Sequence, residues 1–357
     1  MSGLPVEFDT EPECFTLPYT HRFSAEENKF IKAELDRLMS KGILALSHHE
    51  KGEFISPIFL TPKSDGTFRL ILNLKKLNKH MPYHHFKMDT ISTVLNLVTK
   101  DCFMAKVDIK DAYYSVPIKI SDQRYLKFEY NGNLYKFTCL PNGLSSGPRK
   151  FTKLLKPPMA ALRKRKQIVS AYIDDLITIA KTFSLCFDNV KDLVGTIDSL
   201  GFVVHPDKSE FIPSQVIEYL GFVIDSRSMT VSLTSSKKKK VKDMCISLLS
   251  KEKPSIREVA RVLGNFSASF VAVTFGKLHY RNLERDKIFA LRKNMGKFDS
   301  PMIISHQARR DIHWWINNID KSYSDISKNN SRFVMTTDAC QTGWGAVCPW
   351  ARTSGLF

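Results

Sequence analysis

Two adjacent carboxylates, Asp174 and Asp175, lie between two short apolar segments, residues 167–171 and 176–180, whose composition is typical of β-strands. The pattern predicts a hairpin with both acids at its tip. Tight hairpin turns favour Gly, and like charges side by side repel, so folding alone gives little reason to place two acids there. A bound divalent cation would supply that reason, because it offsets the repulsion.

A third carboxylate, Asp108, interrupts the apolar segment at residues 102–109 where the predicted strand should end. Three carboxylates at two strand ends can hold two metal ions for phosphoryl transfer. An isolated Tyr-Xaa-Asp-Asp string is a weak indication, since any solvated turn can carry two acids. The sequence around the string decides between these interpretations.

Five short motifs follow one another along the chain: Lys-Val-Asp-Ile-Lys-Asp-Ala-Tyr-Tyr-Ser-Val-Pro at 106–117, Leu-Pro-Asn-Gly-Leu at 140–144, Tyr-Ile-Asp-Asp at 172–175, His-Pro-Asp-Lys at 205–208 and Tyr-Leu-Gly-Phe at 219–222. In these motifs and their order the chain resembles the reverse transcriptases of retroviruses and long-terminal-repeat-type retrotransposons. The resemblance covers about residues 54–222 and continues more weakly to the end. The amino-acid sequences at 140–151 and at 262–266 are most similar to those of DIRS-type elements.

The resemblance implies an α+β right-hand polymerase with fingers, palm and thumb, and a partial RNase H-like fragment. The expected divisions are an extended N-terminal arm at 1–22, fingers and palm at 23–231, a helical thumb and connection at 232–328, and a truncated RNase H-like start at 329–357. Within the second division, the fingers are expected at about 23–85 and 118–146, and the palm at about 86–117 and 147–231.

In this family two Mg²⁺ ions, with Mn²⁺ as an alternative, activate the primer hydroxyl and neutralise the triphosphate. The resemblance assigns their binding to Asp108, the backbone carbonyl of Ile109, Asp174 and Asp175. It also assigns Lys208 as the general acid for the departing pyrophosphate. The alternatives are that the acids are solvated turn residues and that Lys208 is a surface lysine.

Tyr113 is expected to exclude ribonucleotides, because an aromatic ring beneath the sugar collides with a 2′-hydroxyl. The backbone N–H groups of Asp111 and Ala112 are expected to bind the phosphates, as turns near strand ends can. The alternative is that Tyr113 is a core tyrosine, although Tyr114 suits that structural role better.

Lys63 and Arg69 match the fingers cations that bind the triphosphate, where Arg offers a planar fork of donors and Lys a point charge. Their alternative is a pair of solvated charges on a hairpin. Asn142 occupies the variable position of the Leu-Pro-Xaa-Gly motif, where retroviral enzymes carry Gln and gypsy-type enzymes carry Phe. Its contact with the nucleotide therefore stays open.

The motif at 219–222 resembles the primer grip, or alternatively is only a buried strand. The residues assigned to the grip are Tyr219, Leu220, Gly221 and Phe222. Two basic runs, at 163–166 and 237–240, can contact phosphates, act as a nuclear localisation signal or simply face solvent. Phosphate contact is favoured for the second run, because it opens the predicted thumb.

From about residue 332 the pattern changes to strands, and residues 333–347 resemble the opening hairpin of an RNase H domain. Asp338 is the only acid there in the right local context, and one acid cannot hold a metal pair. Ribonuclease H activity is therefore not expected. The segment is expected to pack loosely or to lean on the connection helices through Trp314 and Trp315.

Capping patterns predict where two helices begin. Ser24, followed by two Glu and the apolar spacing of residues 30–39, predicts a helix that ends near Gly42. Ser255 and Glu258 form a second predicted capping box. Other expected elements are a fingers hairpin from 58–60 and 68–72, a palm helix at about 147–163, another at about 183–200, and a helix at 237–249.

The composition agrees with a nucleic-acid-binding protein. The 357 residues are 43% hydrophobic, enough for a large core, and carry 53 Lys and Arg against 36 Asp and Glu, a net charge of +17 that attracts polyanions. Seven scattered Cys indicate reduced thiols rather than disulfides or zinc. Without a signal-peptide pattern or a membrane-spanning run, an intracellular location is expected, cytoplasmic, nuclear or particle-associated.

The sequence therefore predicts an RNA-directed DNA polymerase of a retroelement that extends a primer on an RNA or DNA template with deoxynucleotides. One rival is a catalytically silent or co-opted remnant that only binds nucleic acid, against which the three intact acids argue. A second rival is a viral RNA-templated RNA polymerase. Those enzymes usually carry Gly-Asp-Asp and lack a bulky residue at the position of Tyr113, so Tyr172 and Tyr113 oppose this interpretation.

Overall fold

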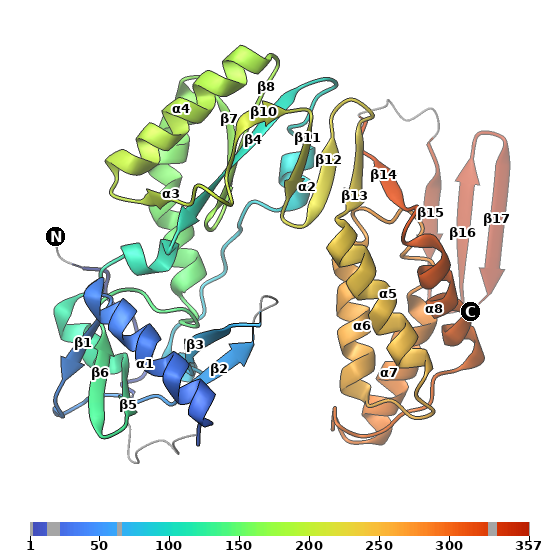
Figure 1. Cartoon of the computed structure of the whole chain (residues 1–357). Helices are drawn as coiled ribbons and strands as arrows, with labels where there is room; N and C mark the ends of the chain where they lie inside the picture. The colour runs from blue at the N-terminus through green and yellow to red at the C-terminus, as the bar shows by residue number, and fades with distance from the viewer. Residues whose placement is uncertain (1–2, 13–21, 63–65, 328–333, 357) are drawn as a thin grey trace.

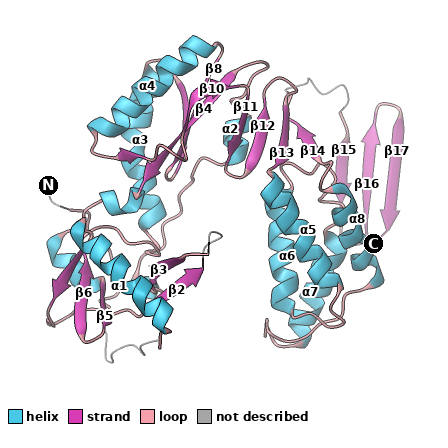
Figure 2. Cartoon of the chain, in the orientation of Figure 1, coloured by secondary structure: helices cyan, strands magenta, loops and turns pink. Residues whose placement is uncertain are grey.

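The computed structural model describes residues 3–12, 22–62, 66–327 and 334–356, and mixes helices with mostly antiparallel strands, as predicted for an α+β protein (Figures 1 and 2). In this part of the chain the helices are α1 (Ala25–Ser40), α2 (Ile91–Leu95), α3 (Gly147–Lys164), α4 (Phe183–Ser199), α5 (Ser235–Leu249), α6 (Ile256–Ser269), α7 (Arg281–Lys293) and α8 (His306–Asn318), with 3-10 turns η1 (Leu77–His80), η2 (Ala112–Ser115) and η3 (Ile120–Tyr125).

The strands in the described residues form separate small sheets rather than one large one. They are β1 (Leu44–Ser47), β2 (Ile58–Pro62), β3 (Phe68–Leu72), β4 (Phe103–Lys110), β5 (Lys127–Tyr130), β6 (Asn133–Phe137), β7 (Ile168–Tyr172), β8 (Asp175–Ala180), β9 (Val203–Val204), β10 (Glu210–Ser214), β11 (Val216–Tyr219), β12 (Phe222–Asp225), β13 (Thr230–Leu233), β14 (Tyr323–Asp325), β15 (Thr336–Ala339), β16 (Gly343–Cys348) and β17 (Ala351–Leu356).

The sheet in the order β10-β4-β8-β7, with β9 added to β4, carries the predicted acids. Helices α3 and α4 pack on it (Figure 1). The predicted hairpin is confirmed as β7 and β8. Because side chains alternate along a strand, Ala105 and Val107 of β4 join the cores beneath these helices, whereas Met104 joins the core on the opposite face. Asp108 shares the face of Met104, where the apolar layer ends.

The N-terminal part of the chain forms an arm of the molecule from α1, the sheet β1-β6-β5 and the hairpin β2-β3. The predicted first helix is confirmed: Ser24 caps α1, and Ser24 and Glu27 complete a capping box. The predicted hairpin of the fingers is confirmed as β2 and β3, although residues 63–65 of its turn lie outside the described residues. The apolar face of α1, with Ile31, Leu35 and Leu38 buried, belongs to the core that also contains Phe151 of α3.

A second arm consists of the sheet β11-β12-β13-β14 and helices α5 to α8, which share a separate core with α2. The predicted capping box of Ser255 and Glu258 is confirmed at the start of α6. At the centre of this core Trp315 is fully buried, stacks on Phe266 at 4.1 Å between ring centroids, and donates its indole N–H to the carbonyl of His279 at 2.8 Å.

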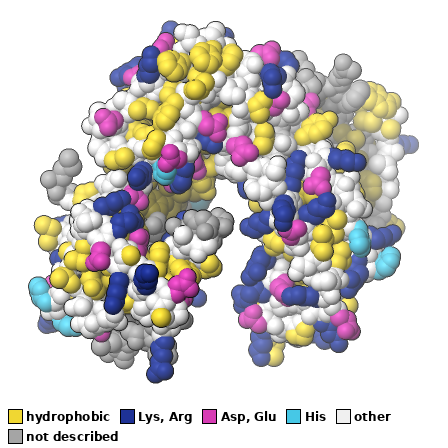
Figure 3. Space-filling model, viewed as in Figure 1, with side chains coloured by type: hydrophobic (Ala, Val, Ile, Leu, Met, Phe, Trp, Pro, Cys, Tyr) yellow, Lys and Arg dark blue, Asp and Glu magenta, His cyan; other side chains and the backbone are white. Residues whose placement is uncertain are grey.

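The two arms are separated by a wide open channel, and the β4-β8-β7 sheet lies above it (Figures 1 and 3). Basic side chains are numerous on the α5 to α7 side of the channel (Figure 3). None of the helices in the described ranges is long and apolar enough to cross a membrane.

Strands β15, β16 and β17 form their own antiparallel sheet near the C-terminus. The strand pattern predicted after residue 332 is therefore confirmed. The expectation that this segment leans on Trp314 and Trp315 is wrong for Trp315, because that ring is enclosed by the helical core. The ring of Trp314 stacks on His279 at 4.1 Å.

Candidate active site

The turn between β7 and β8 has a strained backbone. Tyr172 pairs with Asp175, so the turn consists of Ile173 and Asp174, and Asp175 already belongs to β8. Ile173 has φ +56°, in the first turn position, where Gly is normally required. A β-branched residue there costs on the order of 1–3 kcal/mol, and such strain is concentrated at functional sites.

The carboxylates of Asp108 and Asp175 are brought together by strand register. Asp108 of β4 pairs directly with Asp175 of β8, and like charges in this position destabilise a sheet. Burial first, and then the charges of Asp174 and Asp108, together raise the pKa of Asp175 to about 6. The pKa of Asp108 is also raised, mainly by burial, while Lys208, 3.8 Å away, opposes the increase. Asp108, Asp174 and Asp175 therefore concentrate negative charge at this end of the hairpin.

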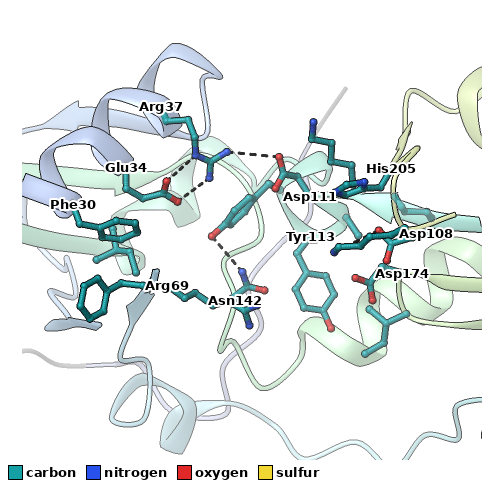
Figure 4. Close-up of a pocket in the computed structure, with 18 residues that line it drawn as sticks. Phe30, Glu34, Arg37, Arg69, Asp108, Asp111, Tyr113, Asn142, Asp174 and His205 are labelled. Carbon is teal, nitrogen blue, oxygen red and sulfur yellow. Dashed lines mark hydrogen bonds and ion pairs between the residues drawn. The ribbon is translucent and has the colours of Figure 1, made fainter. Parts of the chain in front are cut away.

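A pocket of about 540 Å³ opens beside these acids. It is lined by Phe30, Glu34 and Arg37 of α1, residues 68–70 of β3, residues 108–114, Asn142, Ile173, Asp174, His205 and Lys208. Figure 4 shows Arg69 and the α1 side chains at one end and Asp108 and Asp174 at the other, with Tyr113 between them. The pocket therefore joins a cationic end to an anionic end.

The ring of Tyr113 forms part of the pocket wall, next to Asp174 (Figure 4). The ring packs edge to face on Phe151, with centroids 5.4 Å apart. Burial, with the charge of Asp174, raises the pKa of Tyr113 to about 12, so the phenol stays neutral. Tyr113 is thus partly a core residue and partly a pocket residue.

Asp111 initiates the η2 turn in a left-handed conformation, φ +51°. Its carboxylate accepts from Lys41 Nζ at 2.7 Å and lies 3.9 Å from Arg37. Burial acts to raise the pKa of Asp111, but the two cations outweigh burial and the pKa is lowered. The first N–H groups of a helical turn have no partner inside the turn, so those of Asp111 and Ala112 remain suited to an anion.

The other predicted nucleotide ligands fall in different places. Arg69 is exposed and lines the pocket, and Asn142 lines it while donating from Nδ2 to the Tyr114 hydroxyl at 3.3 Å. Tyr114 is therefore the structural partner, as expected. Lys63 lies outside the described residues. Lys208 lines the pocket beside Asp108.

The predicted primer grip does not line this pocket. Tyr219 and Phe222 are buried in the second core, 2% and 5% exposed, and Leu220 and Gly221 form the turn between β11 and β12. The Tyr219 hydroxyl nevertheless donates to the backbone carbonyl of Asp175 at 2.9 Å. The motif is thus a buried strand pair that is tied to the β7-β8 hairpin.

The donor set of the pocket suits Mg²⁺, because carboxylate oxygens are the ligands this ion prefers. Asp108 and Asp174 line the pocket, and the charges of both act on Asp175 and raise its pKa. Within the described ranges, no three His, Cys, Asp or Glu side chains converge to form a complete metal site on their own. The side-chain chemistry of the pocket therefore suits Mg²⁺, although these carboxylates do not close a site by themselves; Ile109 also lines the pocket.

Several pocket residues could not be found from local sequence. Glu34 and Arg37 come from α1, where they form an (i, i+3) ion pair at 2.7 Å, a pattern also found on solvated helices. His205 begins the His-Pro-Asp-Lys motif, and its backbone N–H donates to the Asp108 carbonyl at 2.8 Å. In the sequence, a role for His205 in the pocket was indicated by its place in the same motif as Lys208.

The backbone pairing and the side-chain hydrogen bond of Asp338 are made within the C-terminal sheet and not with residues of this pocket. Asp338 lies on β15, pairs with Gly345 of β16, and is exposed. Its side chain accepts the N–H of Ala339 at 2.8 Å. No other sheet in the described residues pairs with the strands that carry it.

Comparison with known proteins agrees with this geometry. Residues 61–224 match the family described as reverse transcriptase (RNA-dependent DNA polymerase). Among curated proteins, the Tf2-3 and Tf2-7 transposon polyproteins of Schizosaccharomyces pombe are each 23% identical over 231 residues. Each match covers 64% of this chain and 17% of the polyprotein.

Solved structures of the foamy viral protease-reverse transcriptase have the same fold. One in complex with double-stranded DNA has a TM-score of 0.75 at 18% identity and covers 99% of this chain and 60% of that chain. Another, in complex with an RNA/DNA hybrid, has a TM-score of 0.72 and covers 46% of that chain. The predicted right-hand architecture is confirmed by this likeness.

Proposed function

We propose that this chain, whose residues 61–224 are a reverse transcriptase domain, is an RNA-directed DNA polymerase of a retroelement that extends a primer with deoxynucleotides. The observation that carries the proposal is the pairing of Asp108 with Asp175 beside Asp174, at the anionic end of a pocket whose other end is cationic. Neither the strained turn nor the clustered charge helps folding, so both point to catalysis.

The three carboxylates and the Ile109 carbonyl would hold two Mg²⁺ ions, with Mn²⁺ as an alternative. When bound, these ions would supply charge neutralisation for the primer oxygen and the triphosphate. Burial of Asp108, which is 8% exposed, limits competing hydration of the site. The backbone N–H of Asp108 donates to Ser209 Oγ at 3.0 Å, which fixes the strand end that carries the acid.

Other pocket residues would bind and select the nucleotide. Arg69 and Lys63 would hold the triphosphate, together with the amides of Asp111 and Ala112. Tyr113, rigidly packed on Phe151, would block a 2′-hydroxyl. Asn142, held by Tyr114, would contact the base or the sugar.

Lys208 would donate the proton to the departing pyrophosphate. Its ammonium lies 3.8 Å from Asp108 and is largely exposed, so it can reach a leaving group at the pocket mouth. We also propose that the turn of residues 219–222 holds the primer terminus. A 3′ end placed there would lie close to Asp175, because Tyr219 bonds the Asp175 backbone.

Finer assignments rest on the sequence motifs. Residues 140–151 and 262–266 favour a DIRS-type element, within the broader likeness to retrotransposon polyproteins. We assign 23–231 to fingers and palm, 232–328 to thumb and connection, and 329–357 to an RNase H-like start. A cytoplasmic or nuclear location suits the template.

Primer extension on matched RNA and DNA templates tests the function. The purified chain with Mg²⁺ and deoxynucleotides should extend a primer on the RNA template, and a chelator should stop extension. A folded protein that binds template and primer but incorporates no nucleotide on either would instead be a binding protein. Extension that prefers ribonucleotides would favour an RNA polymerase.

A further inference from the structure

The turn between β11 and β12 is held in a narrow conformational range. Leu220 has φ +49° and Gly221 has φ +75°, the two left-handed positions of a tight hairpin turn. The positive φ favours Gly at position 221, and a Cβ added there would overlap the end of the Lys237 side chain, which would have to move. Lys237 therefore lies directly against this turn.

Lys237 is the first lysine of the basic run that opens α5, and its ammonium is already engaged. Its Nζ donates to the Leu220 carbonyl at 2.8 Å and lies 4.4 Å from the centre of the Phe222 ring. A hydrogen bond from a charged donor and a cation–π contact on one group are both stronger away from water. Burial, with the nearby Lys240, lowers the pKa of Lys237.

The rest of the basic run is also largely paired. Lys238 Nζ donates to the Asp320 carbonyl at 2.9 Å, and Lys239 pairs with Asp243 at 2.7 Å. The expectation that this run contacts phosphates therefore does not suit Lys237, because its ammonium would have to leave the half-buried Leu220 carbonyl and the Phe222 ring.

The same turn is tied to the catalytic hairpin on its other side. The hydroxyl of Tyr219, a residue 2% exposed, donates to the Asp175 carbonyl at 2.9 Å. Two hydrogen bonds thus link the β8 strand end, the β11-β12 turn and α5 in sequence. A shift of α5 would be transmitted to the turn through Lys237, and a shift of the turn would be transmitted to Asp175 through Tyr219.

We propose that Lys237 is a positioning residue that fixes the turn of residues 219–222 relative to the catalytic acids, so that the primer 3′-hydroxyl is placed for attack. The inference rests on the proposed function, since it needs a primer terminus at this turn. Lys237 acts through the Leu220 carbonyl and the Phe222 ring. The placement of the primer, rather than the affinity for nucleic acid, depends on it.

The test compares Lys237→Met, which keeps the aliphatic stem but removes the donor and the charge, with the wild-type chain. Lys253→Met, at an exposed lysine before α6, is the matched control. Single-turnover incorporation is measured at saturating deoxynucleotide on a defined RNA template and DNA primer. The dissociation constant of the template–primer is measured separately at several salt concentrations.

Lys237→Met should lower the single-turnover rate about tenfold or more, because small misplacement of reacting groups is costly. The slope of log affinity against log salt should not change. A slope smaller by about 0.7–0.9, with an unchanged rate, would show a phosphate contact instead and overturn the proposal. No change in either quantity would also overturn it. Lys253→Met should leave the rate unchanged.

Two measurements keep the test decisive. Tyr219→Phe removes only the hydroxyl and should lower the single-turnover rate about fivefold or more. This variant takes the place of Lys237→Met in the test if Lys237→Met does not fold. Hydrogen exchange of the amides at 216–225 should be faster in Lys237→Met than in the wild type, whether or not the chain incorporates nucleotides. A wild type without incorporation refutes the proposed function, whereas unchanged exchange in the variant refutes the role of Lys237.

Discussion

Asp175→Asn should stabilise the protein in the absence of divalent cations while removing its response to them. In the folded chain the pKa of Asp175 is raised from 3.8 to about 6, by burial first and then by Asp174 and Asp108. No hydrogen bond to its carboxylate is found among the described residues, so no other group loses an acceptor when Asn replaces Asp175. The substitution removes a half-buried charge that a bound cation would compensate.

The magnitude follows from linkage between protonation and folding. The difference between 3.8 and about 6 corresponds to about 3 kcal/mol at full weight. Solvent screening of this partly exposed carboxylate reduces the value, and we expect about 1–2 kcal/mol. Because the folded-state pKa is raised, the protonated form stabilises the fold below pH 3.8, and this contribution is lost as pH rises through 6. The advantage of the variant should therefore be full at pH 8 and small near pH 4.

The assay is urea unfolding of wild type and Asp175→Asn in a chelator, at pH 8 and at the lowest pH where both fold. Asp198→Asn, an exposed acid at the end of α4, is the control and should change stability by less than about 0.5 kcal/mol. Adding Mg²⁺ at pH 8 should then stabilise the wild type more than the variant. A variant that is less stable than the wild type at pH 8 in chelator would refute the reasoning.

Three further predictions concern selection, positioning and the C-terminal strands. Tyr113→Ala should reduce discrimination against ribonucleotides by at least about tenfold in single-nucleotide kinetics, and unchanged discrimination would make Tyr113 a core residue only. Lys41→Met, just after α1, should raise the deoxynucleotide KM about three- to fivefold by releasing Asp111, with little loss of stability because the pair is partly open to solvent, whereas Lys32→Met, within α1, should not raise KM. Deleting residues 329–357 should leave primer extension unchanged, and a clear loss of extension in the shortened chain would contradict this.

Elements with strong local patterns could be predicted from the sequence. The capping box of Ser24 and Glu27 fixes the start of α1, and the apolar segments on either side of Asp174 fix the β7-β8 hairpin. Both depend on contacts between residues that are close in the chain. The order of motifs then placed Asp108 near that hairpin, although 66 residues separate the two acids.

Contacts between distant segments could not be predicted in the same way. Lys41 pairs with Asp111 across 70 residues, and nothing in the α1 pattern indicates which helix face covers the pocket. Ile173 adopts a left-handed conformation that its own residue type opposes. Trp315 was expected at a contact with the C-terminal strands, but the packing of α6 and α8 encloses it. Tertiary packing decided each of these.

The central claim, that Asp108, Asp174 and Asp175 catalyse nucleotide transfer, is tested most directly by single-nucleotide incorporation with Asp174→Asn. The substitution removes a charge and keeps the side-chain shape in the turn. With template–primer affinity unchanged, incorporation on RNA in the presence of Mg²⁺ should fall by about a hundredfold or more. Incorporation within about twofold of the wild-type rate would show that the chemistry takes place without this carboxylate and would contradict the account.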